Sequence, residues 1–295
     1  VAAYWLVGTV MRDRSNDAFA ATVSDIQDAL VARLSTYRQS LDGVAGLFEA
    51  SDTVTQQDFA NYVRHLRADQ TLVGLNGIGY VEQVARAELP QFLNDARGDG
   101  VADLSVRRDS GGPDLFVLKY IESFRGIELM QGLDISYDEG RRTAAIEARD
   151  SGQPRLTPKL DLGPKDPREP EFPLLKPLYV TGEPTATVAQ RRAAFRGWVC
   201  AAFTGARALQ SLTSSQQSLI EMMVYDGAGA APGELVYDGA TDSDKESARF
   251  QKTEQIDLYG RTWTTAWLST PQFDATQPDK AGLIVLVGGL ALAGF

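Results

Sequence analysis

Apolar residues recur at steps of three and four along the first fifty residues of the chain. Between residues 13 and 50 this stripe consists of Phe19, Val23, Ile26, Leu30, Leu34, Tyr37, Leu41, Val44 and Phe48. Positions three and four apart share one face of an α-helix, so the spacing predicts a single helix about 55 Å long. Such a stripe can pair with a second copy in a dimer or pack on the chain's own domain, and the spacing supports both arrangements equally.

Shorter elements follow this helix. Thr55 and Asp58 form a capping box, which predicts a second helix over 56–68. Strand-like apolar segments then lie at 72–83, 103–108, 115–121, 155–162 and 172–179. Turn residues bound these segments, which together predict a first antiparallel sheet over about 72–182.

A third helix and a second group of strands complete the pattern. Ser136 and Glu139 match a capping box and Gly152 is a stop signal, which predicts a helix between them. Later strand candidates lie at 197–203, 223–226, 234–238, 254–259 and 262–268. They predict a second antiparallel sheet over about 195–270. The expected fold class is therefore α+β, with a long helix followed by two sheets.

Both ends of the sequence are apolar. Residues 1–11 are VAAYWLVGTVM, and residues 281–295 contain no charged side chain. A helix needs about 20 apolar residues to span a bilayer, and each segment is shorter. Because both segments reach an end of the sequence, we expect them to be cut transmembrane helices. The long segment between them would then lie on one side of the membrane.

The composition limits the chemistry. Lys and Arg number 29 against 39 Asp and Glu, and this net charge of −10 argues against nucleic acid as a partner. The single histidine, His65, and the single cysteine, Cys200, exclude an intramolecular disulfide and a Cys/His zinc cluster. No metal or cofactor is expected. His65 lies beside Arg64 on the second predicted helix, so we expect a solvated side chain rather than a catalytic base.

Three segments resemble a known family. They are GLFEAS at 46–51, GIGYVE at 77–82 and GLDISYDEGRRTAAIEARDSGQPRLT at 132–157, which continues to PLLKPLY at 173–179. The third segment is the most specific, because it combines the Gly-Leu-Asp strand end, the Arg-Arg helix and the Gly-Gln-Pro turn in order. On these segments the sequence resembles a CHASE domain, the extracytoplasmic sensory module of bacterial and plant transmembrane receptors.

The resemblance implies a division of the chain. A first transmembrane helix would end within 1–11, a stalk helix and helical linker would occupy 12–70, a membrane-distal PAS-like subdomain 71–190, a membrane-proximal PAS-like subdomain 191–278, and a second transmembrane helix would begin at 279–295. It further implies a homodimer through the stalk helix, a location on the periplasmic side of the inner membrane, and a cytoplasmic histidine kinase or diguanylate cyclase in the parent protein. The module itself is expected to bind and signal, not to catalyse.

The resemblance also implies a small-molecule ligand, a cytokinin-like compound or another small metabolite, in the distal subdomain. Thr157 occupies the place of a threonine that lines the pocket in similar plant receptors. Side chains alternate along the 115–121 strand, so either Phe116, Leu118 and Tyr120 or the opposite set would line an apolar pocket. We take the set that contains Tyr120, because this side chain can combine ring packing with a hydroxyl hydrogen bond. The full set of expected ligand contacts is Tyr80, Phe116, Leu118, Tyr120, Asp134, Thr157, Leu174 and Tyr179.

Two other functions remain open at this stage. The chain could be a structural dimerisation module whose pocket is filled by its own side chains. It could also be a membrane-anchored hydrolase that uses two carboxylates, for which Asp134 and Glu122 are the candidate pair. An empty apolar cavity would favour the sensor, and a fully packed core would favour the structural module.

Overall fold

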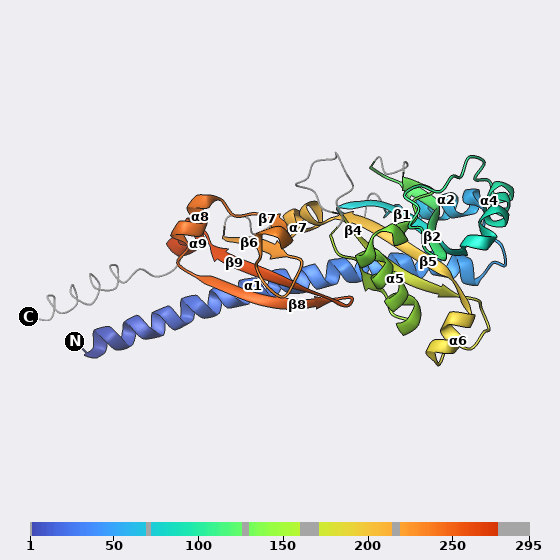
Figure 1. Cartoon of the computed structure of the whole chain (residues 1–295). Helices are drawn as coiled ribbons and strands as arrows, with labels where there is room; N and C mark the ends of the chain where they lie inside the picture. Colours follow the sequence, from blue (N-terminus) through green and yellow to red (C-terminus); the bar gives the residue numbers. More distant parts are fainter. Residues whose placement is uncertain (1, 69–71, 126–129, 160–170, 214–218, 277–295) are drawn as a thin grey trace, which may run out of the picture. The chain divides into compact units, whose positions relative to one another are not determined.

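The protein is described by a computed structural model that covers residues 2–68, 72–125, 130–159, 171–213 and 219–276 (Figure 1). The fold is α+β, as the sequence predicts, and the chain divides into two compact units. The larger unit comprises Val31–Ala208 and Asp257–Thr262. The smaller unit comprises Val1–Leu30, Leu209–Ile256 and Trp263–Phe295.

The long helix α1 runs from Ala2 to Glu49, in agreement with the predicted helix over its described length. All nine residues of the apolar stripe are buried, none of them more than 4% exposed. In the smaller unit Phe19 packs against Phe250 and Phe273, and in the larger unit Tyr37 packs against Phe203. The stripe therefore packs on the chain's own domains, and any pairing of α1 with a second copy would have to use other side chains.

A five-stranded antiparallel sheet forms the centre of the larger unit, with the strand order β2-β1-β5-β4-β3. Its strands are β1 (Leu75–Ala85), β2 (Asp114–Ser123), β3 (Arg155–Leu156), β4 (Glu171–Tyr179) and β5 (Phe195–Thr204). The sequence placed the 197–203 strand in the second sheet, but the structure pairs β5 with both β1 and β4. Pairing over such a separation leaves no trace in the local pattern.

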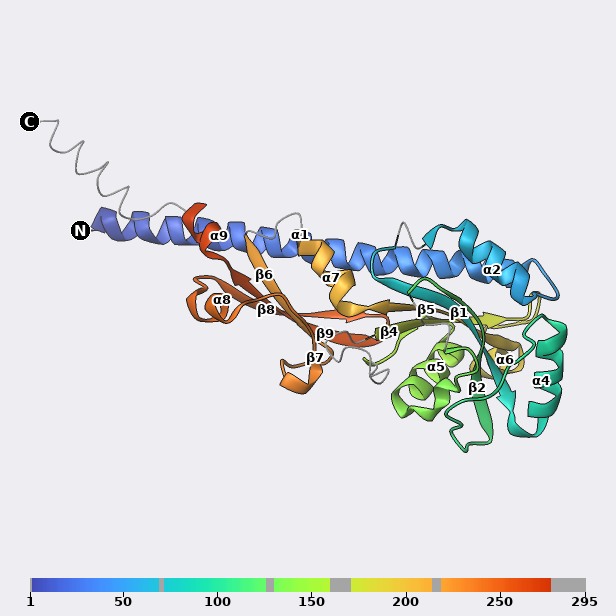
Figure 2. The same ribbon diagram turned by 90° about the horizontal axis from the view of Figure 1, so that it is seen from above.

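Helices cover both faces of this sheet. Figure 2 shows α1 and α2 (Gln56–His65) on one side and α5 (Glu139–Ser151) on the other. The larger unit also contains η1 (Arg86–Glu88), α4 (Leu89–Gly98), η3 (Ile135–Tyr137) and α6 (Val188–Ala193). The capping box of Thr55 and Asp58 is confirmed at the start of α2. The sheet thus has one face toward α1 and a second face toward α5.

The predicted helix at 136–152 begins later than expected. Its N-cap is Asp138, whose side chain accepts a hydrogen bond from the amide of Arg141. Ser136 cannot be the cap, because it lies in η3 and its backbone and hydroxyl both bond to Asp134. The predicted end is confirmed, since Gly152 is left-handed with φ 74° at the C-cap.

Two predicted strands are shorter than expected. The segment 103–108 contains only an isolated bridge between Arg107 and Leu133. Arg108 has a left-handed backbone with φ 53°, which is incompatible with a continuing strand. The strand expected over 155–162 is confined to β3 in the described part of the chain, and residues 160–162 lie outside the described residues.

A bulge divides β2 into two parts. Tyr80 pairs with Tyr120 and the next residue of β1 pairs with Leu118, so Lys119 has no opposite residue. One extra residue moves every later side chain to the other face of the sheet. Phe116 and Leu118 share a core cluster on the α5 side, whereas Tyr120 packs on the α1 side. The structure therefore differs from the expectation that all three share one face.

The smaller unit contains a four-stranded antiparallel sheet with the order β7-β6-β9-β8. Its strands are β6 (Ile220–Tyr225), β7 (Leu235–Asp238), β8 (Gln251–Leu258) and β9 (Arg261–Ser269), with α7 (Gly205–Thr213), η4 (Pro232–Glu234), α8 (Asp242–Ser247) and α9 (Pro271–Thr276) around them. The predicted hairpin of 223–226 with 234–238 is confirmed by the pairing of β6 with β7. Trp263 is fully buried and its indole donates to Asp226, 3.0 Å away.

Of the two membrane segments predicted at the ends, the structure describes only the first. Residues 2–11 belong to α1, while 279–295 lie outside the described residues. Across the described ranges, no helix combines the length and the apolar character needed to cross a bilayer.

The carboxylate of Asp150 joins α5 to α6, and we expect this contact to shape the acid stability of the protein. Arg192 Nε and Arg149 Nε donate to Oδ1 at 3.0 and 2.9 Å. Hydrogen bonds from Arg192, and next from Arg149, lower the pKa of Asp150 from 3.8 to about 2. A folded-state pKa below the unfolded value stabilises the fold above about pH 4, and this contribution disappears as the pH falls toward 2.

Asp150→Asn should therefore flatten the loss of stability between about pH 4 and pH 2. The measurement is urea unfolding of both proteins across this range, with exposed Asp103→Asn as the control. An unchanged slope in Asp150→Asn would contradict the assignment.

Candidate functional site

A cavity lies on the α5 side of the five-stranded sheet. Its volume is about 60 Å³. The apolar part of its wall comes from the strands and from the segment before α5, and includes Gly79, Val81, Leu118, Leu133, Ile135 and Leu175. An apolar hollow with a few polar groups is the usual composition of a small-molecule site in proteins.

Gly79 helps to keep this space open. A Cβ atom at this position would lie 2.6 Å from Leu118 Cδ1 and 3.2 Å from Cys200 Sγ. Because contacts below 3.0 Å are not tolerated without movement, a larger residue would have to displace Leu118. The glycine-rich sequence at 72–83 therefore has a packing role in the wall of the cavity.

Arg141 is the cation of this cavity among its described lining residues. It lies in the first turn of α5, where Asp138 fixes its backbone amide at 2.9 Å. Helical spacing places it on the same buried face as Ala145 and Ala148, and only 2% of its surface is exposed. The fold thus directs a guanidinium toward the core instead of toward water.

One edge of the Arg141 guanidinium lacks acceptors. In the described part of the chain, neither its Nε nor its Nη2 has a hydrogen-bond partner. Its Cζ lies 5.3 Å from the centre of the Tyr137 ring, and Arg108 stacks on the same ring at 5.0 Å. Burial lowers the pKa of Arg141. Tyr137, Asp138 and Glu171 oppose this shift, and Arg108 adds to it. An arginine nevertheless keeps its charge in a protein, so a charged group with two unbonded nitrogens is held in a mostly apolar space.

Thr157 and Glu171 supply the other polar groups of the cavity wall. Thr157 is fully buried, and its hydroxyl donates to the carbonyl of Pro158 at 3.1 Å. This bond leaves the lone pairs of the hydroxyl available to a donor on a ligand. Glu171 is 7% exposed and accepts a hydrogen bond of 2.8 Å from the side chain of Asn76.

Of the eight residues expected to contact a ligand, Leu118 and Thr157 line the cavity. Phe116 belongs to the adjacent core cluster and packs against Trp198. Tyr80 and Tyr120 lie on the opposite face of the sheet, with their rings 5.7 Å apart. Their hydroxyls donate to backbone carbonyls of Arg196 and Val54 at 2.9 and 2.8 Å.

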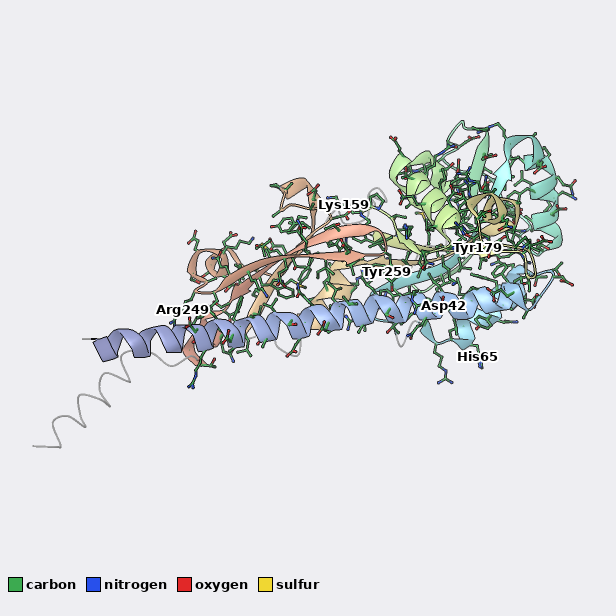
Figure 3. All side chains as sticks on the ribbon, turned by 90° about the horizontal axis from the view of Figure 1, so that it is seen from below. Asp42, His65, Lys159, Tyr179, Arg249 and Tyr259 are labelled. Carbon is green, nitrogen blue, oxygen red and sulfur yellow. The ribbon has the colours of Figure 1, made fainter. Side chains whose placement is uncertain are left out.

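The last three expected residues do not line the cavity either. Leu174 is buried and, by alternation with the cavity-lining residues 173 and 175 of β4, points to the α1 face. The hydroxyl of Tyr179, labelled in Figure 3, donates to the carbonyl of Arg149. Asp134 is fully buried, and its carboxylate accepts hydrogen bonds from three backbone amides and one hydroxyl.

The candidate residues for other chemistry are also placed by the structure. His65 is exposed on α2 (Figure 3), in agreement with the expectation of a solvated side chain. Cys200 lines the cavity, and burial raises the pKa of its thiol to about 12. Among the described residues, no cluster of His, Cys, Asp and Glu is suited to hold a metal ion.

Sequence reasoning did not identify Arg141 or Glu171 as cavity residues. A usable signal existed for Arg141, because it lies four and seven positions before two alanines of the buried helix face. A charged residue in register with a buried stripe is a candidate for function. Glu171 gave no such signal, because its position depends on the pairing of β4 with β5.

Comparison with solved structures shows a related fold. The periplasmic sensory domain of the Campylobacter jejuni chemoreceptor Tlp1 aligns with a TM-score of 0.53 at 8% identity, covering 91% of this chain and 99% of that chain. A domain of a putative sensory box/GGDEF family protein from Vibrio parahaemolyticus aligns with a TM-score of 0.48 at 11% identity, covering 90% of this chain and 99% of that chain. The fold of long helix and two sheets is thus similar to that of the periplasmic sensory domain.

Sequence comparison gives the family. No curated protein sequence matches the chain. The family model described as the CHASE domain matches residues 52–237, which is more than half of the chain. The residues that carry the resemblance noted above fall mostly within this match. This chain therefore belongs to the CHASE domain family of extracytoplasmic sensor domains of membrane receptors.

Proposed function

We propose that this domain senses a small molecule, which binds in the cavity between the five-stranded sheet and α5. The observation that carries the proposal is the cavity itself, an apolar space of about 60 Å³ with polar groups at few points of its wall. A purely structural core would be expected to fill such a space, because protein interiors are close-packed. Leu118 and Thr157 are the proposed contacts from the expected set, and Phe116 supports the wall behind them.

The receptor arrangement is part of the same proposal and is supported by the family. The domain would lie on the periplasmic side of the inner membrane, between two membrane helices, in a homodimer formed along α1. Ligand binding would bias a histidine kinase or diguanylate cyclase on the cytoplasmic side. A ligand can shift such an equilibrium only if it binds the two states with different affinity. The domain itself would bind and signal without catalysing.

The hydrolase alternative finds no support in the geometry. It requires two carboxylates in one cleft, and neither Asp134 nor Glu122 lines the cavity. Glu122 lies on β2 near Arg64 of α2, with 3.8 Å between Oε1 and Nε. The four hydrogen bonds of Asp134 are those of a structural group.

The proposal is tested by filling the cavity. Ala202 lines the cavity, so Ala202→Leu should occupy part of its space. Thermal unfolding of the chain is measured against small organic acids, amino acids and adenine derivatives. A compound at one hundred times its Kd should stabilise the wild type by about 2.7 kcal/mol, and Ala202→Leu should abolish this shift.

Exposed Ala186→Leu provides the matched control, because it adds the same side chain outside the cavity. It should respond to the compound as the wild type does. If no compound stabilises the folded wild type, or if Ala202→Leu responds normally, the cavity is not the binding site. The first of these results would favour the structural module.

A further inference from the structure

The cavity contains a cation with one edge that makes no hydrogen bond, and this edge restricts the chemistry of the ligand. Nε and Nη2 of Arg141 form one edge of the guanidinium fork, and both are buried without a partner in the described part of the chain. These two N–H groups point in parallel and match the two oxygens of a planar carboxylate. The unsatisfied pair is thus the pair needed for a bidentate bond to one anionic group.

Two carboxylates, Asp138 and Glu171, attract the charge of Arg141, but neither bonds to its Nε or Nη2 in the described part of the chain. The groups that act on it are Tyr137, Asp138, Arg108 and Glu171. Asp138 uses its Oδ1 to cap α5, and Glu171 accepts from Asn76. Arg108 adds a second positive charge beside the same Tyr137 ring. The free edge of Arg141 is therefore left for an acceptor that the described part of the chain does not supply.

The size and lining of the cavity further restrict the chemical class of the ligand. A space of about 60 Å³ is less than half of the ~150 Å³ cavity that holds benzene in a protein. The wall beyond the polar groups is apolar, which suits a short alkyl chain and not a second charged group. An adenine-type ligand would require the cavity to widen. We infer that the ligand is a short-chain monocarboxylate whose carboxylate binds Nε and Nη2 of Arg141.

This inference rests on the proposed function and makes a distinct prediction about the ligand-free protein. Arg141→Met keeps an unbranched side chain and removes the buried charge with its two unbonded nitrogens. A buried charge that is retained for binding lowers the stability of the ligand-free protein. Arg141→Met should therefore melt several degrees above the wild type when no ligand is present. A merely structural arginine would give the opposite result, because its loss would lower the melting temperature.

The binding experiment uses propionate and butyrate on the whole chain, followed by titration calorimetry and thermal unfolding. Both should bind the wild type, and Arg141→Met should weaken the binding by on the order of 100-fold. Butyramide has the same shape as butyrate without the charge. It should bind the wild type at least as weakly as butyrate binds Arg141→Met. Nitrate tests whether a planar anion suffices without an alkyl chain, and it should bind more weakly than butyrate.

Arg142→Met is the matched control, because Arg142 is adjacent on α5 and does not line the cavity. It should bind butyrate as the wild type does. If a neutral compound stabilises the wild type and Ala202→Leu blocks it, the sensor function stands and the carboxylate inference is overturned. The inference is also overturned if butyrate binds Arg141→Met normally, or if that variant melts below the wild type. If no compound binds, the proposed function fails with it.

Discussion

Trp198→Ala should lower the free energy of unfolding by about 3–5 kcal/mol, the range for a large aromatic residue removed from a core. Trp198 is fully buried in the core cluster next to the cavity. Its ring centre lies 4.7 Å from that of Phe116 and 4.5 Å from that of Phe195. Its indole also donates a buried hydrogen bond of 2.9 Å to the carbonyl of Ala145 on α5. The substitution removes both the packing and the link between sheet and helix.

The loss is measured by urea unfolding, and it should appear as a drop in melting temperature of roughly 10 °C. Trp198→Phe serves as the comparison, because it keeps one aromatic ring in the core and loses the hydrogen bond and the second ring of the indole. That variant should be destabilised by about 1–2 kcal/mol. A loss below about 1 kcal/mol in Trp198→Ala would show that the sheet and α5 are not held together through this residue.

Asp134→Ala should be destabilising by about 3–5 kcal/mol, because it leaves several buried donors without an acceptor. The carboxylate accepts from the amides of Ser110, Phe116 and Ser136 at 2.9, 2.9 and 3.0 Å. It also accepts from the hydroxyl of Ser136 at 2.6 Å. These bonds join the 105–112 loop, β2 and η3, so a single side chain fixes three segments around the cavity.

Two further variants separate this role from a general effect of charge. Asp134→Asn keeps one acceptor oxygen and should lose less stability than Asp134→Ala. Asp103→Ala removes an exposed carboxylate from a nearby loop and should change stability by no more than about 0.5 kcal/mol. Equal unfolding midpoints for Asp134→Ala and the wild type would refute the structural role of this carboxylate.

Local patterns predicted those elements whose cause is local. The stripe of α1 depends only on helical spacing, and each of its members is buried. The capping box at Thr55 and the stop at Gly152 are likewise settled within a few residues. Ser136 is not the N-cap, and its hydroxyl donates instead to the buried carboxylate of Asp134. The helix start therefore moved to Asp138.

The cavity could not be predicted from the local sequence pattern, because it depends on long-range strand pairing. The unpaired Lys119 reverses the alternation of β2, so Leu118 reaches the cavity and Tyr120 does not. β5 joins the first sheet through pairs such as Gly79 with Cys200, which are far apart in the sequence. Thr157 could be expected from the family resemblance, and it lines the cavity. Arg141 required knowledge of which helix face the sheet would cover.

The burial of the single thiol, Cys200, affects how readily the protein is oxidised outside the cytoplasm. Oxidants attack the thiolate form of cysteine. With a pKa of about 12, Cys200 is ionised in about one molecule in 10⁵ at pH 7. The sequence also offers no second cysteine for an internal disulfide. A domain that works in an oxidising compartment can therefore keep a cysteine in the wall of its cavity without losing activity through gradual oxidation of the thiol.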